Sequence, residues 1–134
     1  MPPSLLQTFY KEISSTFNKT NEQNFSSTVE INAGHPIFHG HFKQVPITPG
    51  VCIIQMIKEI VSEKLQIDLF LEEGNNIKFL AMVNPLETPK LTIQFQLTQV
   101  ENGLVCVASC STDTAVCVKF KGKFKVVKTG NSYV

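Results

Sequence analysis

The stretch His35–Glu59, HPIFHGHFKQVPITPGVCIIQMIKE, decides the fold of this sequence. Its first half is irregular and contains the sequence's three histidines, His35, His39 and His41. Its second half predicts a helix over residues 49–65, with Thr48 as N-cap and Pro49 in the first helical position. This segment is apolar almost all round, and a helix of that kind lies inside a fold.

The residues on either side of this helix predict one long antiparallel sheet. Alternation of apolar and polar residues predicts strands over 25–31, 76–82, 89–101, 103–112 and 115–127. Asn102-Gly103 predicts a hairpin turn, and residues 112–114 predict a second one. Long strands beside one buried helix imply an α+β fold in which the sheet wraps that helix. Residues 1–134 are expected to form one domain with a frayed tail at 129–134.

The segment before residue 18 predicts an additional helix. Its apolar residues recur at three- and four-residue intervals, at Leu5, Leu6, Phe9, Ile13 and Phe17. That spacing is typical of an amphipathic helix, here over about residues 4–17, with one side against the core.

Composition excludes several classes of protein. Of the 134 residues, 43% are hydrophobic and 17% charged, and the net charge is +1, which argues against disorder and against a polybasic protein that neutralises phosphates. A net charge near zero favours association.

The four cysteines form no CxxC pair, so we expect reduced thiols in a cytoplasmic protein. We expect no signal peptide, and the apolar stretch 45–61 is too interrupted to span a membrane.

Every basic residue of the sequence is lysine, and several lie near its C-terminal end. Lys119, Lys121, Lys123 and Lys125 alternate with Phe120, Gly122, Phe124 and Val126. In a strand this places all four lysines on one face. That face is either a solvated outer surface or a docking surface for an acidic partner. Nucleic acid is not expected as a partner, because the aromatic residues face inward and offer no stacking surface.

The histidine-rich segment and the helix start allow two chemical interpretations. A metal site at His35, His39 and His41 lacks a nearby carboxylate ligand, so we expect no metal, and His35 and His39 are expected to satisfy backbone groups in a loop. Alternatively, the N–H groups of Gly50 and Val51 at the helix N-terminus polarise a carbonyl oxygen. A neutral histidine nearby then removes an α-proton from the polarised thioester.

The motif GHPIFHGHF–VPITPGV resembles the signature of the 3-hydroxyacyl-acyl-carrier-protein dehydratases of the hot-dog fold. The resemblance rests on His35-Pro36, Phe38, Gly40-His41-Phe42, Pro46 and Pro49-Gly50-Val51, and it spans most of residues 25–127. It implies a hot-dog fold, a long curved antiparallel sheet wrapped around one central helix. It also implies a dimer formed through edge strands, with active sites at the interface.

The resemblance assigns roles to particular residues. It implies that His41 is the catalytic histidine and that the Gly50 N–H is the carbonyl donor, with Val51 and Phe42 also in the substrate site. The family's acid would stand fourteen residues after His41, where this sequence has Gln55. Glutamine does not exchange protons near pH 7, and loss of one acid–base partner typically costs about 10²–10⁴-fold in rate. Glu59 lies one turn further along the same helix face and is the nearest candidate replacement.

Three hypotheses follow for the function. The first is a dehydratase (a lyase) that converts 3-hydroxyacyl thioesters of acyl carrier protein to 2-enoyl thioesters in fatty-acid or related lipid or polyketide synthesis. The second is a non-catalytic acyl-thioester-binding subunit of a hot-dog heterodimer, and the third is a hot-dog thioesterase. Acyl-coenzyme A is the alternative carrier. We expect a homodimer or higher oligomer, or a heterodimer with a second hot-dog protein. No cofactor is expected beyond the phosphopantetheine that carries the substrate.

Overall fold

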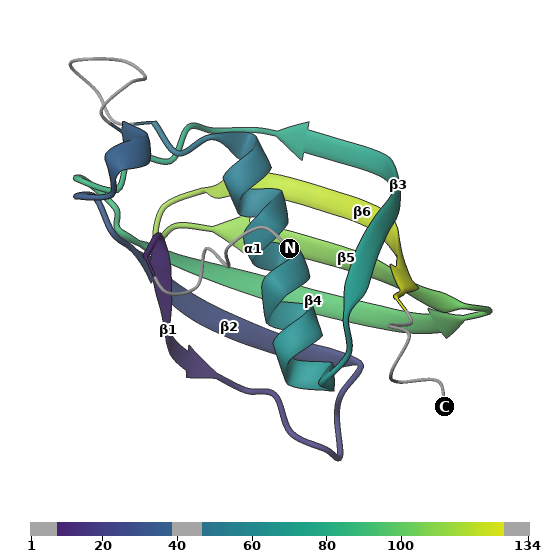
Figure 1. Cartoon of the computed structure of the whole chain (residues 1–134). Coiled ribbons are helices and arrows are strands. Elements are labelled where there is room, and N and C mark those ends of the chain that lie inside the picture. The colour runs from purple at the N-terminus through teal and green to yellow at the C-terminus, as the bar shows by residue number, and fades with distance from the viewer. Residues whose placement is uncertain (1–7, 39–46, 128–134) are drawn as a thin grey trace.

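The computed structural model describes residues 8–38 and 47–127, which form an antiparallel sheet of six strands with one α-helix lying across it (Figure 1). The spatial order of the strands is β1-β2-β4-β5-β6-β3. The elements are β1 (Tyr10–Ser15), β2 (Asn24–Ile31), the 3-10 helix η2 (Pro36–Phe38), α1 (Gly50–Leu65), β3 (Leu69–Phe79), β4 (Lys90–Val100), β5 (Gly103–Ser111) and β6 (Val116–Val126). The predicted antiparallel sheet around one central helix is confirmed.

Helix α1 packs one of its sides against the sheet. The buried side chains of that side are Cys52, Ile53, Met56, Ile57, Ile60 and Val61. Val51, on the other side, is 74% exposed. The helix ends at Gln66, whose φ of 58° is left-handed, so the chain turns away after Leu65. Along residues 8–38 and 47–127, no helix has the length and apolar character needed to cross a membrane.

The predicted N-cap of this helix is wrong. Pro49, not Thr48, is the residue that precedes the first helical turn, and no side chain caps the helix there. Thr48 is held elsewhere, because its N–H donates to the Val83 carbonyl at 2.9 Å and its side chain is buried. This backbone bond ties the chain before α1 to the loop that follows β3.

The register of the sheet separates a buried face from an outer face. Phe25, Phe95, Ala108, Phe120 and Ile77 face one another in a single inward row across five strands. The hairpin at Asn102-Gly103 is confirmed, with Asn102 at φ 65°. The strand expected over 76–82 begins earlier, at Leu69, and ends at Phe79.

The helix predicted over residues 4–17 is wrong for residues 10–15, which form strand β1. Residues 4–7 of that prediction, and the predicted tail at 129–134, lie outside the described residues. Strand β1 pairs with the edge of β2, where Tyr10 lies opposite Ile31. Consecutive Phe9 and Tyr10 are both buried, whereas Ile13 is 46% exposed, so the apolar spacing does not mark one buried helix face. Pairing with an open sheet edge outweighs the weak helix propensity of a segment rich in Ser and Thr.

The four cysteines of the sequence are free and buried. Cys106, Ala108 and Cys110 share the inward face of β5, as their alternation predicts. Burial raises the pKa of the Cys106 and Cys110 thiols to about 12. These thiols therefore act as small apolar side chains of the core.

Candidate active site

Two of the predicted site residues lie outside the described part of the chain. They are His41 and Phe42, and the neighbouring His39 is outside it as well. His35 is described: its Nδ1 accepts a hydrogen bond from the Ile37 N–H at 3.0 Å, and its ring packs edge-on against Phe9. The prediction that His35 satisfies a backbone group in a loop is confirmed. Within the described ranges, no cluster of three or more His, Cys, Asp or Glu side chains could hold a metal ion.

A mostly apolar cavity of about 420 Å³ opens beside the first turn of α1. Its walls come from the chain around the helix start, from the end of β3 with the loop that follows it, and from β6; they are formed by Ile47, Thr48, Gly50, Ile53, Phe79, Leu80, Ala81, Met82, Val83 and Val118. The first helical hydrogen bonds run from Cys52 and Ile53 to the Pro49 carbonyl, at 3.0 and 3.4 Å. The N–H groups of Gly50 and Val51 therefore have no partner within the helix and lie at the positive end of its dipole.

A side chain at Gly50 would collide with the Phe79 ring where the helix meets β3. A Cβ at this position would lie 2.5 Å from Cε1 of Phe79, closer than real side chains approach. Phe79 is the last residue of the edge strand β3, and its side chain is 55% exposed. The glycine thus allows the phenyl ring to lie against the helix start as one wall of the cavity.

Thr48 adds an unpaired polar group to the same wall. Among the described residues its buried Oγ1 has no hydrogen-bond partner. A buried hydroxyl without a partner costs roughly 1–3 kcal/mol of stability. Such a group beside a helix N-terminus whose first N–H groups have no partner within the helix gives the cavity a small polar corner in an apolar surround.

Gln55 and Glu59 form a hydrogen-bonded chain with a residue of β1. Gln55 Nε2 donates to Glu59 Oε2 at 2.9 Å, and the Tyr10 hydroxyl donates to Glu59 Oε1 at 3.1 Å. Tyr10 is 2% exposed. Burial raises the pKa of the Tyr10 phenol well above its usual range, and the adjacent Glu59 carboxylate raises it further. The phenol therefore stays protonated and remains a donor to Glu59.

This chain fixes the orientation of the Gln55 amide. An ionised carboxylate only accepts hydrogen bonds, so the Gln55 NH₂ group must face Glu59. The carbonyl oxygen Oε1 then lies on the opposite side of the amide. Gln55 consequently offers Oε1 as an acceptor on the side away from Glu59, and the second N–H of its NH₂ group remains a donor.

The structure does not bring all the predicted site residues together within one chain. Gly50 lines the cavity beside β3, whereas the described residues of its wall include neither Gln55 nor Glu59. Glu59 instead contacts Tyr10 on β1, and β1 and β3 are the two opposite edges of the sheet. A ligand held by Gly50 therefore does not reach Gln55 of the same chain through this cavity.

Large apolar side chains surround the cavity and the β3 edge. Val51, Phe79, Leu80, Met82 and Leu86 are between 53% and 77% exposed. β3 pairs with β6 along one side only, and its other side is an edge of the sheet. An open edge strand flanked by exposed apolar side chains is typical of an interaction surface.

Tyr10 is the site residue that the sequence analysis missed. The helix predicted over residues 4–17 gave Tyr10 no relation to Glu59, 49 residues away. No local sequence signal links the two residues, since the contact depends on β1 pairing at the edge of the sheet.

The fold and this site together define a class of protein. A six-strand antiparallel sheet around a single helix is the hot-dog fold, and this chain adds a cavity at the helix N-terminus. The sequence matches the model of the ApeI-like family, described as ApeI dehydratase, over residues 17–121. The chain therefore belongs to the ApeI-like dehydratase family.

Solved structures share this fold at low sequence identity. The dehydratase heterocomplex ApeI:P from Xenorhabdus doucetiae matches with a TM-score of 0.71 and 16% identity, over 86% of this chain and 96% of that chain. An uncharacterised protein from Erwinia carotovora matches with a TM-score of 0.65 and 20% identity, over 90% and 97%. A hypothetical thioesterase with coenzyme A from Streptococcus pneumoniae matches with a TM-score of 0.62 and 12% identity, over 90% and 87%. A search of curated proteins gives no match.

Proposed function

We propose that this protein is a subunit of a hot-dog dehydratase that eliminates water from 3-hydroxyacyl thioesters carried by acyl carrier protein. The observation that carries the proposal is the start of α1, where Gly50, in the first turn of the helix, lines a mostly apolar cavity. The N–H donors of a helix N-terminus stabilise a carbonyl oxygen as negative charge develops on it. Membership of the ApeI-like family supports the reaction class.

The elimination requires one proton to leave the α-carbon and one to reach the leaving hydroxyl. In the proposed reaction, His41 removes the α-proton, the C2–C3 double bond forms, and the C3–O bond breaks to release water. The thioester carbonyl is held by the helix N-terminus, with Thr48 beside it. Val51 and Phe42 contribute to the substrate site. No cofactor takes part apart from the phosphopantetheine arm of the carrier.

Gln55 is proposed to bind the substrate hydroxyl rather than to protonate it. Glu59 holds the Gln55 NH₂ group, so Oε1 is the free end that accepts a hydrogen bond from the hydroxyl. The proton for the departing hydroxyl then comes either from the histidine that took the α-proton or from an acid on a second subunit. Glu59 takes part by fixing Gln55 and not as a direct proton donor.

A site shared between two chains fits the separation of Gly50 and Gln55. In one chain they lie on different sides of α1, and the open β3 edge with its exposed apolar rim offers a surface for a second hot-dog chain. A homodimer would bring Gln55 of one chain toward the cavity of the other. In the second candidate function, a heterodimer, this chain supplies the thioester-binding cavity while a partner supplies the carboxylic acid. The heterocomplex described for the Xenorhabdus doucetiae protein supports that candidate.

Hydration of a 2-enoyl thioester, the reverse reaction, tests the proposal. The purified protein is expected to add water to a 2-enoyl pantetheine thioester, and His41→Ala is expected to abolish the activity. Release of free thiol is followed in the same assay, because a thioesterase would release thiol without changing the double bond. Wild-type activity no higher than that of His41→Ala would refute catalysis by the isolated protein.

Gln55→Glu separates the homodimeric enzyme from the heterodimer subunit. If the missing acid limits the isolated protein, the substitution is expected to raise the rate by about 10²-fold or more. Gln55→Leu is the matched control, since it removes the acceptor without adding an acid. An active wild type that gains nothing from Gln55→Glu would exclude the need for a partner's acid.

A further inference from the structure

The outer face of the sheet carries two polar rows that each contain lysine on the β6–β3 side. Ser26, Gln94, Ser109, Lys119 and Lys78 are in register across five strands, and the neighbouring row is Asn24, Gln96, Val107, Lys121 and Asn76. We call these ten residues the outer rows. They contain three lysines and no acid, and Val107 is the single apolar member.

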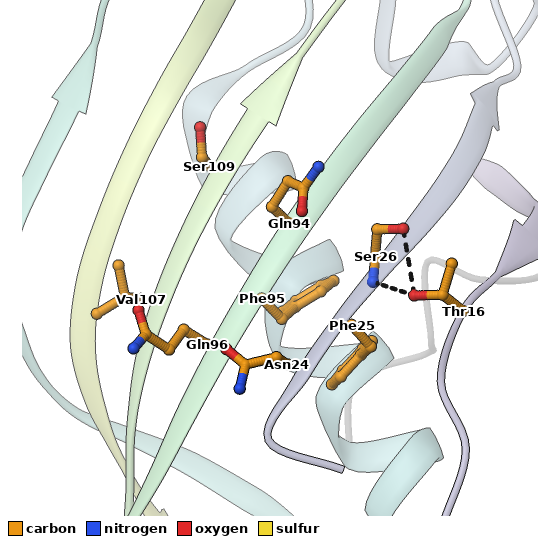
Figure 2. A pocket seen from close by; sticks show the side chains of 9 residues that line it. All are labelled: Thr16, Asn24, Phe25, Ser26, Gln94, Phe95, Gln96, Val107 and Ser109. Carbon is orange, nitrogen blue, oxygen red and sulfur yellow. Dashed lines mark hydrogen bonds between the residues drawn. The ribbon is translucent and has the colours of Figure 1, made fainter. Parts of the chain in front are cut away.

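The neutral part of the outer rows is hollowed. A depression of about 460 Å³ lies over β2, β4 and β5, and Figure 2 shows the side chains that line it, among them Asn24, Gln94, Gln96 and Ser109. These amide and hydroxyl groups are donors as well as acceptors. The hollow therefore offers hydrogen-bond donors and acceptors to a partner surface.

The cationic part lies at the β6–β3 side and lacks local neutralisation. Lys119 faces Ser109 on one side and Lys78 on the other, and Lys121 faces Val107 and Asn76. Within the described residues, none of the three lysines forms an ion pair, whereas Lys123 further along β6 pairs with Glu72 at 3.3 Å. Like charges directly opposite each other in a sheet are destabilising, so the Lys78–Lys119 pair does not serve the fold.

This cationic corner is next to the cavity at the helix start. Lys78 precedes Phe79 and Lys119 follows Val118, and both of those neighbours line the cavity from the inner face. The corner and the cavity are thus separated by the thickness of a single sheet at its edge. A partner bound to the outer rows would therefore lie close to this cavity.

We propose that the outer rows are the docking surface for the acidic acyl carrier protein that delivers the thioester, with Lys78, Lys119 and Lys121 contacting its carboxylates. The inference rests on the proposed function for the choice of partner. Charge complementarity carries it, since three unpaired lysines beside a neutral donor-rich hollow match an acidic surface. Lysine suits this task as a compact point charge in a sequence that has no arginine.

The test measures binding of purified acyl carrier protein to wild type, Lys119→Glu, Lys121→Glu and Lys19→Glu. Lys19 lies in the exposed loop between β1 and β2, so its reversal makes the same change in net charge away from the outer rows. We expect Lys119→Glu and Lys121→Glu each to weaken binding about tenfold or more and to flatten its salt dependence. Lys19→Glu is expected to bind like wild type. The melting temperature of Lys119→Glu should not fall, because the new glutamate faces Lys78.

Hydration of a 2-enoyl pantetheine thioester is measured on the same variants. This substrate has no carrier protein, so the rate should be the same for all four proteins. No turnover by any of them would contradict catalysis by the isolated protein and leave the binding comparison intact. Four outcomes would each overturn the docking surface. In the carrier-binding assay, they are equal weakening by all three charge reversals, no weakening by any of them, and no carrier binding by wild type. The fourth is lysine-dependent binding of single-stranded DNA instead of the carrier.

Discussion

Replacing Tyr10 with Phe tests the hydrogen-bonded chain that fixes Gln55. Tyr10 is 2% exposed, and its hydroxyl donates to Glu59 at 3.1 Å. A hydrogen bond to a charged group contributes roughly 1.5–3 kcal/mol, and Phe fills nearly the same volume. We expect Tyr10→Phe to lower the free energy of unfolding by about 2 kcal/mol at pH 7.

The pH dependence of this loss gives a second, independent measurement. Burial and then Glu59 raise the pKa of Tyr10 above its ordinary value of 10.0. Above that pH the unfolded chain releases the phenolic proton while the folded chain keeps it. The stabilisation from this group is thus complete below pH 10 and declines as the pH rises, by about 1.4 kcal/mol at pH 11. The difference between wild type and Tyr10→Phe should shrink from about 2 kcal/mol at pH 7 to about 0.6 kcal/mol at pH 11.

Urea unfolding at pH 7 and at pH 11, followed by circular dichroism, measures the stability loss of Tyr10→Phe and its change with pH. The buried thiols of Cys106 and Cys110 titrate equally in both proteins and cancel in the difference. Glu59→Gln is the companion variant, because it keeps an acceptor for Tyr10 but removes the charge. In that background Tyr10→Phe should cost about 1 kcal/mol. A loss below about 0.5 kcal/mol at pH 7, or a difference that does not change with pH, would refute the reasoning.

Three further substitutions probe the glycines and the helix start. Gly50→Ala forces the exposed Phe79 ring aside, so we expect a stability loss of about 1 kcal/mol in urea unfolding. We also expect the rate of thioester hydration to fall tenfold or more, and an unchanged rate would contradict the role of this site. Gly103→Ala meets the backbone oxygen of Phe124, 2.0 Å from the new Cβ, and should destabilise by about 3 kcal/mol or more; a smaller loss would mean that the hairpin can shift. Thr48→Val removes a buried hydroxyl that has no partner among the described residues, so we expect thermal stability to rise by about 1 kcal/mol and thioester hydration to slow. A fall in stability would show that the hydroxyl has a partner.

Sequence periodicity predicted most of the fold because its signals are local. The alternation of β4, β5 and β6 follows from a side-chain period of 2 residues, whereas α1 was predicted from the long apolar run after Pro49. Asn102-Gly103 predicted its turn for an equally local reason, the ability of Asn to adopt a positive φ. The lysine alternation in β6 correctly predicted an outer cationic face.

The errors occurred where a distant contact decides the local structure. Residues 10–15 have apolar spacing compatible with a helix, but the open edge of β2 recruits them as a strand. Thr48 is a good N-cap in isolation, yet its backbone bond to Val83 holds it in the cavity wall instead. The Tyr10–Glu59 contact depends on that same strand. The family resemblance pointed to Gln55 and Glu59 as candidate site residues but could not reveal what orients them.

The strand order has a consequence for how the chain folds. β3 pairs only with β6, although residues 80–115 lie between them in the sequence. During synthesis, β3 therefore leaves the ribosome long before its only neighbour exists, with Phe70 and Phe79 exposed on an unpaired edge. Such a non-local pairing is slow to form and leaves a β-edge open to other chains. Truncation within β6 should therefore yield an aggregating chain rather than a smaller folded one, because pairing with β6 is what keeps β3 in its native sheet.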